Sequence, residues 1–251
     1  MAEKLKYFVN GQFRESKTDK WYDLHNPSTG EITGQAPCCT NDEVLEAIAA
    51  AKAAYPGWSA TPAIKRAQIL YRVRELILER MDELTMSVAK ENGKVWAESE
   101  GDVLKAKEGT ELATQVPSLM MGESIMDASR GYDTVKYREP LGVFAGIVPV
   151  NFPAMIPFGW MAPTCIATGN TLVLKAASLT PKTAMLFAQL YKDAGVPDGV
   201  INVVTCSRNE INTILEHPDV KGITFVGSTP VGLKIYEKAA ANGKRCQALC
   251  Q

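Results

Sequence analysis

Short apolar runs alternate with segments of helical periodicity through the second half of the chain. The runs are rich in β-branched residues and predict strands buried on both faces, at residues 143–148, 171–174, 200–204, 223–226 and 246–249. Helical patterns separate them, over residues 152–167, 181–194, 209–216 and 229–241. Because helical crossovers impose parallel pairing, the fold class predicted is α/β, with an open, doubly wound parallel sheet.

The first half predicts a strand pair followed by helices. Residues 7–13 have Asn10-Gly11 between aromatic and β-branched residues, which is typical of a tight β-hairpin. Thr40 and Glu43 form a capping-box pattern at the start of one helix. Thr61-Pro62 is predicted to start a single long helix that carries its apolar stripe over residues 64–88 and ends at Gly93, and residues 96–115 predict another helix.

Between the two halves the periodicity changes from helical to alternating. Within residues 123–139, a Ser-Arg-Gly turn at 129–131 is followed by residues 134–138, which alternate with period two. This pattern predicts a β-hairpin that protrudes from the rest of the fold.

Composition and charge exclude several classes of protein. The 251 residues are 46 % hydrophobic and 22 % charged, which is typical of a globular chain with its own core. The net charge of −1 provides no basic excess for a nucleic-acid partner. No apolar stretch reaches membrane-spanning length, and the first residues lack the apolar core of a signal peptide. We therefore expect a cytoplasmic protein without nucleic-acid or membrane partners.

The cysteines and histidines do not predict a metal site. The six cysteines form no Cys-x-x-Cys pair, and only two histidines are present. Buried free thiols in a reducing compartment are the simpler interpretation. Cys246, which follows Lys244-Arg245, is the best placed of them for a lowered pKa, but its segment is predicted to be a strand.

Candidate binding residues follow successive predicted strands. They are Pro149-Val150-Asn151, Lys175 with Ser178, Thr205, and Gly227-Ser228. The carboxyl ends of parallel strands meet at one edge of a sheet, where such folds bind ligands. An amide donor, a cation and a helix N-terminus together suit an anionic, nucleotide-like ligand.

Each of these features also has a purely structural interpretation. Gly227-Ser228 could be a turn and a helix cap, Lys175 a solvated lysine, and Asn151 the cap of a helix starting at residue 152. The G-x-G-x-x-G fingerprint of ordinary dinucleotide-binding folds is absent. The functional interpretation depends on the joint placement of the residues after consecutive strands.

Three motifs in this order resemble the aldehyde dehydrogenase superfamily. They are Pro149-Val150-Asn151-Phe152-Pro153, Gly169-Asn170-Thr171-Leu172-Val173-Leu174-Lys175, and Phe225-Val226-Gly227-Ser228-Thr229. Finer segments, at 117–123, 151–157, 217–221 and 243–248, resemble its methylmalonate-semialdehyde dehydrogenase branch. The resemblance implies NAD-linked oxidation of a small aldehyde, with transfer of the acyl group to coenzyme A.

The resemblance also assigns roles by position. It implies that Asn151 donates its amide to the oxyanion, that Lys175 holds the adenosine ribose, and that Gly227 and Ser228 hold the pyrophosphate. Pro149 and Val150 would line the cofactor channel.

Two positions depart from the pattern of the family. Ser178 replaces the glutamate that binds the ribose hydroxyls and repels a 2′-phosphate, so we expect measurable NADP binding as well. Lys105 stands where the branch has an arginine thought to read an anionic group, and lysine lacks its planar two-pronged geometry.

The nucleophilic cysteine of the superfamily lies in a second domain beyond residue 251. Residues 1–122 and 140–251 are therefore predicted to be the nucleotide-binding domain, with the catalytic domain absent from this chain and the chain alone inactive. The resemblance makes residues 123–139 an oligomerisation hairpin, which implies a homo-oligomer, a dimer or tetramer at full length. An unpaired strand edge there favours association.

The sequence leaves two other functions open. One is a succinate-semialdehyde or other non-acylating aldehyde dehydrogenase. The other is a nucleotide-binding module without catalysis, which would keep the strand-end residues but need no second domain.

Overall fold

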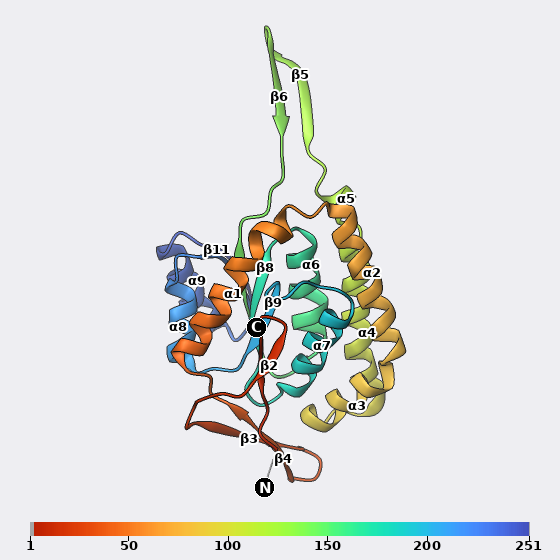
Figure 1. Cartoon of the computed structure of the whole chain (residues 1–251), viewed down its shortest axis with the longest axis vertical. Helices are drawn as coiled ribbons and strands as arrows, with labels where there is room; N and C mark the ends of the chain where they lie inside the picture. Colours follow the sequence, from red (N-terminus) through yellow and green to blue (C-terminus); the bar gives the residue numbers. More distant parts are fainter. Residues whose placement is uncertain (1–2, 251) are drawn as a thin grey trace.

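The computed structural model describes residues 3–250, and its centre is a seven-stranded sheet (Figure 1). The strand order is β11-β10-β7-β8-β9-β1-β2. The strands are β1 (Tyr7–Val9), β2 (Gln12–Arg14), β7 (Val143–Ile147), β8 (Thr171–Lys175), β9 (Ile201–Val204), β10 (Val220–Gly227) and β11 (Arg245–Cys250). The five strands from β11 to β9 are parallel, which confirms the doubly wound sheet.

The chain winds outward from β7 in two directions. It proceeds through β8 and β9 on one side and returns to β10 and β11 on the other. Such a reversal of strand order leaves a crevice at the carboxyl ends of the two diverging strands, here β7 and β10. The register aligns these ends, because Ile147 lies opposite both Lys175 of β8 and Phe225 of β10.

Helices cover both faces of the sheet (Figure 1). One face packs against α1 (Asn41–Ser59), α8 (Arg208–Glu216) and α9 (Thr229–Ala241), and a buried apolar cluster joins them to the sheet. The other face has a second apolar cluster under two layers of helix. These helices are α2 (Ala63–Glu79), α3 (Met81–Asn92), α4 (Trp96–Ala113), α5 (Val116–Leu119), η1 (Ile156–Met161), α6 (Ala162–Ala167) and α7 (Lys182–Asp193).

Two predicted hairpins are present. In the first, Asn10 and Gly11 adopt left-handed backbone angles, with φ of 50° and 70°, as a tight two-residue turn requires. The second comprises β5 (Glu123–Ser129) and β6 (Tyr132–Lys136) and projects from the body (Figure 1). Every residue of these two strands is exposed.

A further antiparallel pair, β3 (Trp21–His25) with β4 (Ile32–Pro37), was not predicted. Only the turn between the strands has a clear local signal, at Asn26-Pro27-Ser28-Thr29-Gly30. The strands themselves mix polar residues with Gly34 and Pro37, which are depleted in strands.

The prediction of one continuous helix between Thr61 and Gly93 is wrong. The backbone breaks at Arg80, where φ is −110° and ψ is 21°, so that α2 and α3 are separate helices. The Arg80 guanidinium then binds Glu83 of α3 and faces Asp193 of α7. The break directs the apolar side chains of α3, such as Leu84 and Val88, towards α4 and α7.

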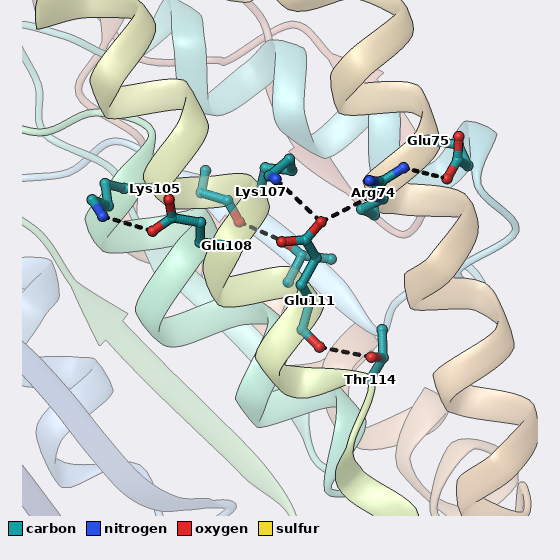
Figure 2. Close-up of polar contacts among 9 residues, drawn as sticks. Arg74, Glu75, Lys105, Lys107, Glu108, Glu111 and Thr114 are labelled. Atoms are coloured by element: carbon teal, nitrogen blue, oxygen red, sulfur yellow. Dashed lines mark hydrogen bonds and ion pairs between the residues drawn. The ribbon is translucent and has the colours of Figure 1, made fainter.

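Charged side chains connect α2 to α4 across their outer faces. Figure 2 shows the Glu111 carboxylate of α4 between Lys107, one turn away, and Arg74 of α2. The Glu111 oxygen lies 3.0 Å from Nε of Arg74 and 3.1 Å from Nζ of Lys107. Because these groups are exposed to solvent, we expect each pair to contribute little to stability.

The predicted helix over residues 152–167 is wrong at its start. Residues 150–154 form a loop, and the helical segment begins at Met155 and continues as the π-helical turn η1 from Ile156. Pro153 and Pro157 lack the N–H groups that an earlier helical ladder would use. Asn151 is therefore not a helix cap, and the cap position of η1 is Met155.

Candidate functional site

A cavity of about 460 Å³ opens beside the carboxyl ends of the sheet, between α8 and α9. Its apolar walls come from the end of β7 and from residues spaced one turn apart on each helix, namely Ile147, Ile211, Leu215, Val231 and Ile235. Lys175, Cys206, Arg208, Asn212, Pro230, Lys234 and Lys238 complete the lining. The cavity therefore combines an apolar interior with a basic rim of Lys175, Arg208, Lys234 and Lys238.

Lys175 is the predicted site residue that lines this cavity. It is the last residue of β8 and lies opposite Ile147 on one side and Val204 on the other. Burial lowers the pKa of its ammonium group, and the thiols of Cys206 and Cys38 are the neighbours that oppose this shift. A polar or anionic ligand would stabilise the charged form of this desolvated lysine beside the two thiols.

Gly227 and Ser228 join β10 to α9 at the same edge. A Cβ at Gly227 would lie 2.6 Å from the Phe225 ring, so a larger residue there would force this buried ring to shift. Ser228 occupies the cap position of α9 but makes no side-chain cap hydrogen bond. Its hydroxyl is exposed at the positive end of a 13-residue helix, which is a favourable position for phosphate.

Hydrogen bonds to α3 and α4 restrain the loop that carries Pro149, Val150 and Asn151. Nδ2 of Asn92 donates to the Val150 carbonyl at 2.7 Å. The buried Asp102 accepts the Met155 N–H at 2.7 Å and the Lys94 ammonium at 3.1 Å. Burial outweighs these bonds and raises the pKa of the Asp102 carboxyl.

These anchors leave Asn151 itself exposed to solvent. Nζ of Lys94 lies 3.9 Å from the centre of the Phe152 ring, so the residue after Asn151 is also restrained. Asn151 is thus placed beside the switch point of the sheet with its surroundings fixed. Half-buried Ser178 lies on the neighbouring loop, between β8 and α7.

The Lys105 side chain is paired with a neighbour on its own helix. Its Nζ lies 2.6 Å from the Glu108 carboxylate, and both groups are more than half exposed. Figure 2 shows this pair on the side of α4 away from α2.

The buried thiols are poorly suited to nucleophilic attack. Burial raises the pKa of Cys39, Cys165 and Cys206 to about 12, and it also raises that of Cys246. Thiols with such pKa values are protonated at neutral pH, whereas the thiolate is the reactive form. The proximity of Cys246 to Lys244 and Arg245 in the sequence does not lower its pKa.

Sequence reasoning missed the basic rim of Arg208, Lys234 and Lys238 and the apolar walls. The signal was present in the i, i+4 spacing of Ile211 with Leu215 and of Lys234 with Lys238. This spacing alone does not show that α8 packs against α9, which is what brings the two faces to one cavity. Over residues 3–250, no group of three or more His, Cys, Asp or Glu side chains is arranged to hold a metal ion. Nor is any helix within that range long and apolar enough to cross a bilayer.

Comparison with known proteins gives relatives over nearly the whole chain. Methylmalonate-semialdehyde/malonate-semialdehyde dehydrogenase [acylating] of Rattus norvegicus is 44 % identical over 244 residues, covering 97 % of this chain and 45 % of the relative. Malonate-semialdehyde dehydrogenase 2 of Geobacillus kaustophilus is 46 % identical over 248 residues, covering 99 % of this chain and 51 % of the relative. The chain thus spans about half the length of the curated relatives it matches.

Solved structures share the fold closely. A Sinorhizobium meliloti protein assigned as a methylmalonate-semialdehyde dehydrogenase and complexed with NAD superimposes with a TM-score of 0.97 at 35 % identity, covering 100 % of this chain and 51 % of that one. The enzyme of the same name from Oceanimonas doudoroffii gives 0.96 at 39 % identity, covering 99 % of this chain and 50 % of that one. The model of the aldehyde dehydrogenase family matches residues 13–250. With its motifs at the carboxyl edge of a doubly wound sheet, the chain belongs to the aldehyde dehydrogenase family.

Proposed function

We propose that this chain is the NAD-binding part of a dehydrogenase for methylmalonate semialdehyde or a similar semialdehyde. The observation that carries the proposal is the cavity with Lys175 at its edge and the α9 N-terminus beside it. The adenosine would occupy the apolar interior, Lys175 would bind its ribose hydroxyls, and Gly227 and Ser228 would hold the pyrophosphate. Pro149, Val150 and Asn151 then lie along the path of the nicotinamide end.

The chemistry proposed for the complete enzyme is oxidation of the semialdehyde with transfer of the acyl group to coenzyme A. Support comes from the relatives whose names state an acylating activity. Within this chain, the role proposed for Asn151 is to donate its amide to the oxyanion that forms when a thiol adds to the aldehyde. NAD, when bound, accepts the hydride.

We further propose that the protein acts in the cytoplasm, where its six free cysteines would stay reduced.

The test is NAD binding by isothermal titration calorimetry to the purified 251-residue chain. We expect Lys175→Met to weaken binding roughly tenfold or more, because hydrogen bonds to a charged group typically contribute about 1.5–3 kcal/mol. Lys65→Met is the control, since Lys65 is an exposed lysine on α2, remote from the cavity. If the Lys175→Met variant and the unmodified chain bind NAD with equal affinity, the proposed contact between Lys175 and the ribose is wrong.

A further inference from the structure

The turn that joins α3 to α4 contacts the Asn151 loop on both sides of that residue. Nδ2 of Asn92 donates a hydrogen bond to the Val150 carbonyl at 2.7 Å. Two residues further along the turn, Nζ of Lys94 lies 3.9 Å from the centre of the Phe152 ring. In the part of the chain that the structure describes, the Asn151 amide has no hydrogen-bond partner. Its position therefore depends on how its two neighbours are held.

Asp102 of α4 fixes the same lysine from its other side. One carboxylate oxygen lies 3.1 Å from Nζ of Lys94, and the other accepts the Met155 N–H at 2.7 Å. The Asp102 side chain is fully buried, and the Lys94 side chain is only 15 % exposed. Removing one partner of a buried pair leaves an uncompensated charge, so the pair holds its geometry closely. A single carboxylate thus connects the cation against Phe152 with the backbone three residues later.

Gly93 gives the turn its shape. It ends α3 in the left-handed region, with φ of 77°, and its N–H donates to the Ala89 carbonyl at 2.9 Å. A Cβ at this position would lie 3.0 Å from Cβ of Pro27. Because the backbone of the turn is fixed by this cap, the flanking Asn92 and Lys94 have little freedom to move away from the loop.

An exposed amide needs such contacts if it is to act on reacting atoms. Asn151 lies on a loop, residues 150–154, that has neither helix nor strand of its own. A hydrogen-bond donor that stabilises developing charge must be held in place before the reaction begins. Misplacement by about 1 Å can cost on the order of 100-fold in rate. Contacts to Val150, Phe152 and Met155 restrain the loop without occupying the Asn151 side chain.

We propose that the turn at residues 92–94 and Asp102 are a positioning unit that holds Asn151 at the nicotinamide end of the site. Asn92, Lys94 and Asp102 act through the neighbours of Asn151 and not by touching the cofactor. This inference rests on the proposed function, which places the Asn151 loop along the path of the nicotinamide.

The experiment compares the binding of NAD and of adenosine 5′-monophosphate to the purified 251-residue chain by calorimetry. The monophosphate reports only on the adenosine end, between α8 and α9, whereas NAD also needs the Asn151 loop. We expect Lys94→Met and Asp102→Asn to lower the affinity for NAD roughly threefold or more while the affinity for the monophosphate is retained. This is the size expected from one lost cation–π contact or hydrogen bond. Lys94→Arg, which keeps a cation, should restore most of the ratio.

Two further variants separate positioning from a general loss of structure. Asn92→Ala removes one exposed hydrogen bond, leaves the buried pair intact, and should also lower the ratio. Lys107→Met is the matched control, because this lysine of α4 is 19 % exposed, is paired with Glu111 and lies on the outer face of α4. It should leave the ratio unchanged.

An unchanged ratio in the three loop variants would overturn the inference and leave the proposed function standing. An equal fall in affinity for both ligands would do the same, because it would show a merely structural role. If neither NAD nor the monophosphate binds the unmodified chain, the proposed function fails and the inference fails with it.

Discussion

Glu91 is the residue whose ionisation is most closely tied to the fold near the site. Its carboxylate is buried at the end of α3 and accepts the backbone N–H groups of Lys182 and Thr183, at 2.8 Å and 3.0 Å. Glu91 thus caps the N-terminus of α7 from another helix. The preceding loop carries Ser178, and its Thr180 hydroxyl donates to the Val150 carbonyl at 3.4 Å. Both candidate binding loops therefore depend on the end of α3.

Burial raises the pKa of Glu91 from 4.5 to about 7, despite these two hydrogen bonds. Because the native state then binds this proton more tightly than the unfolded state, the free energy of unfolding should fall as pH rises between these two values. The neutral variant Glu91→Gln should reduce this pH dependence. Urea unfolding at pH values near 5 and near 8 measures it, with the exposed Glu237→Gln as control. The same pH dependence in all three proteins would contradict the assignment.

At the scale of elements, the hairpin β5–β6 is the part of the chain least connected to a core. It projects from the body (Figure 1), and its apolar side chains Ile125 and Val135 are 60 % and 51 % exposed. Exposed strand edges with apolar side chains favour pairing with another chain. We propose that this hairpin mediates self-association, in line with the oligomerisation role that the family resemblance implies.

The double variant Ile125→Thr/Val135→Thr should reduce self-association and leave the melting temperature unchanged. Threonine retains β propensity while the exposed apolar area falls. Light scattering over a range of concentrations measures the effect. Ile32→Thr is the matched control, because Ile32 is a strand residue that is 51 % exposed and lies far from the hairpin in the sequence. A monomer at every concentration in the unmodified chain would contradict the proposal.

At the scale of the whole molecule, the buried thiols beside the proposed nucleotide site are poorly suited to attack an aldehyde. The pKa values of Cys39, Cys165, Cys206 and Cys246 are all raised by burial. We therefore expect the 251-residue chain to bind NAD without reducing it when malonate semialdehyde is added. NADH absorbance measured with and without the aldehyde tests this. Aldehyde-dependent NADH formation that a thiol reagent abolishes would show the expectation to be wrong.

Local signals along the chain were enough to predict the parallel strands, the two hairpins and most helices. Each of these depends on neighbouring residues, such as the apolar run of β8 or the Asn10-Gly11 turn. The strand-end residues could be named for the same reason, since parallel strands bring their carboxyl ends together. The break at Arg80 could not be foreseen, because the apolar stripe continues through it and only packing against α4 and α7 turns the chain.

The geometry of the site depends on contacts between distant segments. The loop bearing Asn151 is held by Asp102, whose carboxylate bonds a residue 53 positions away, and Glu91 reaches 92 positions to Thr183. The basic rim exists only because α8 and α9 lie side by side over the ends of the strands. Propensity and periodicity act over a few residues, so they predict elements and strand ends. Packing between distant segments alone decides which charges lie in one cavity and which loops are restrained.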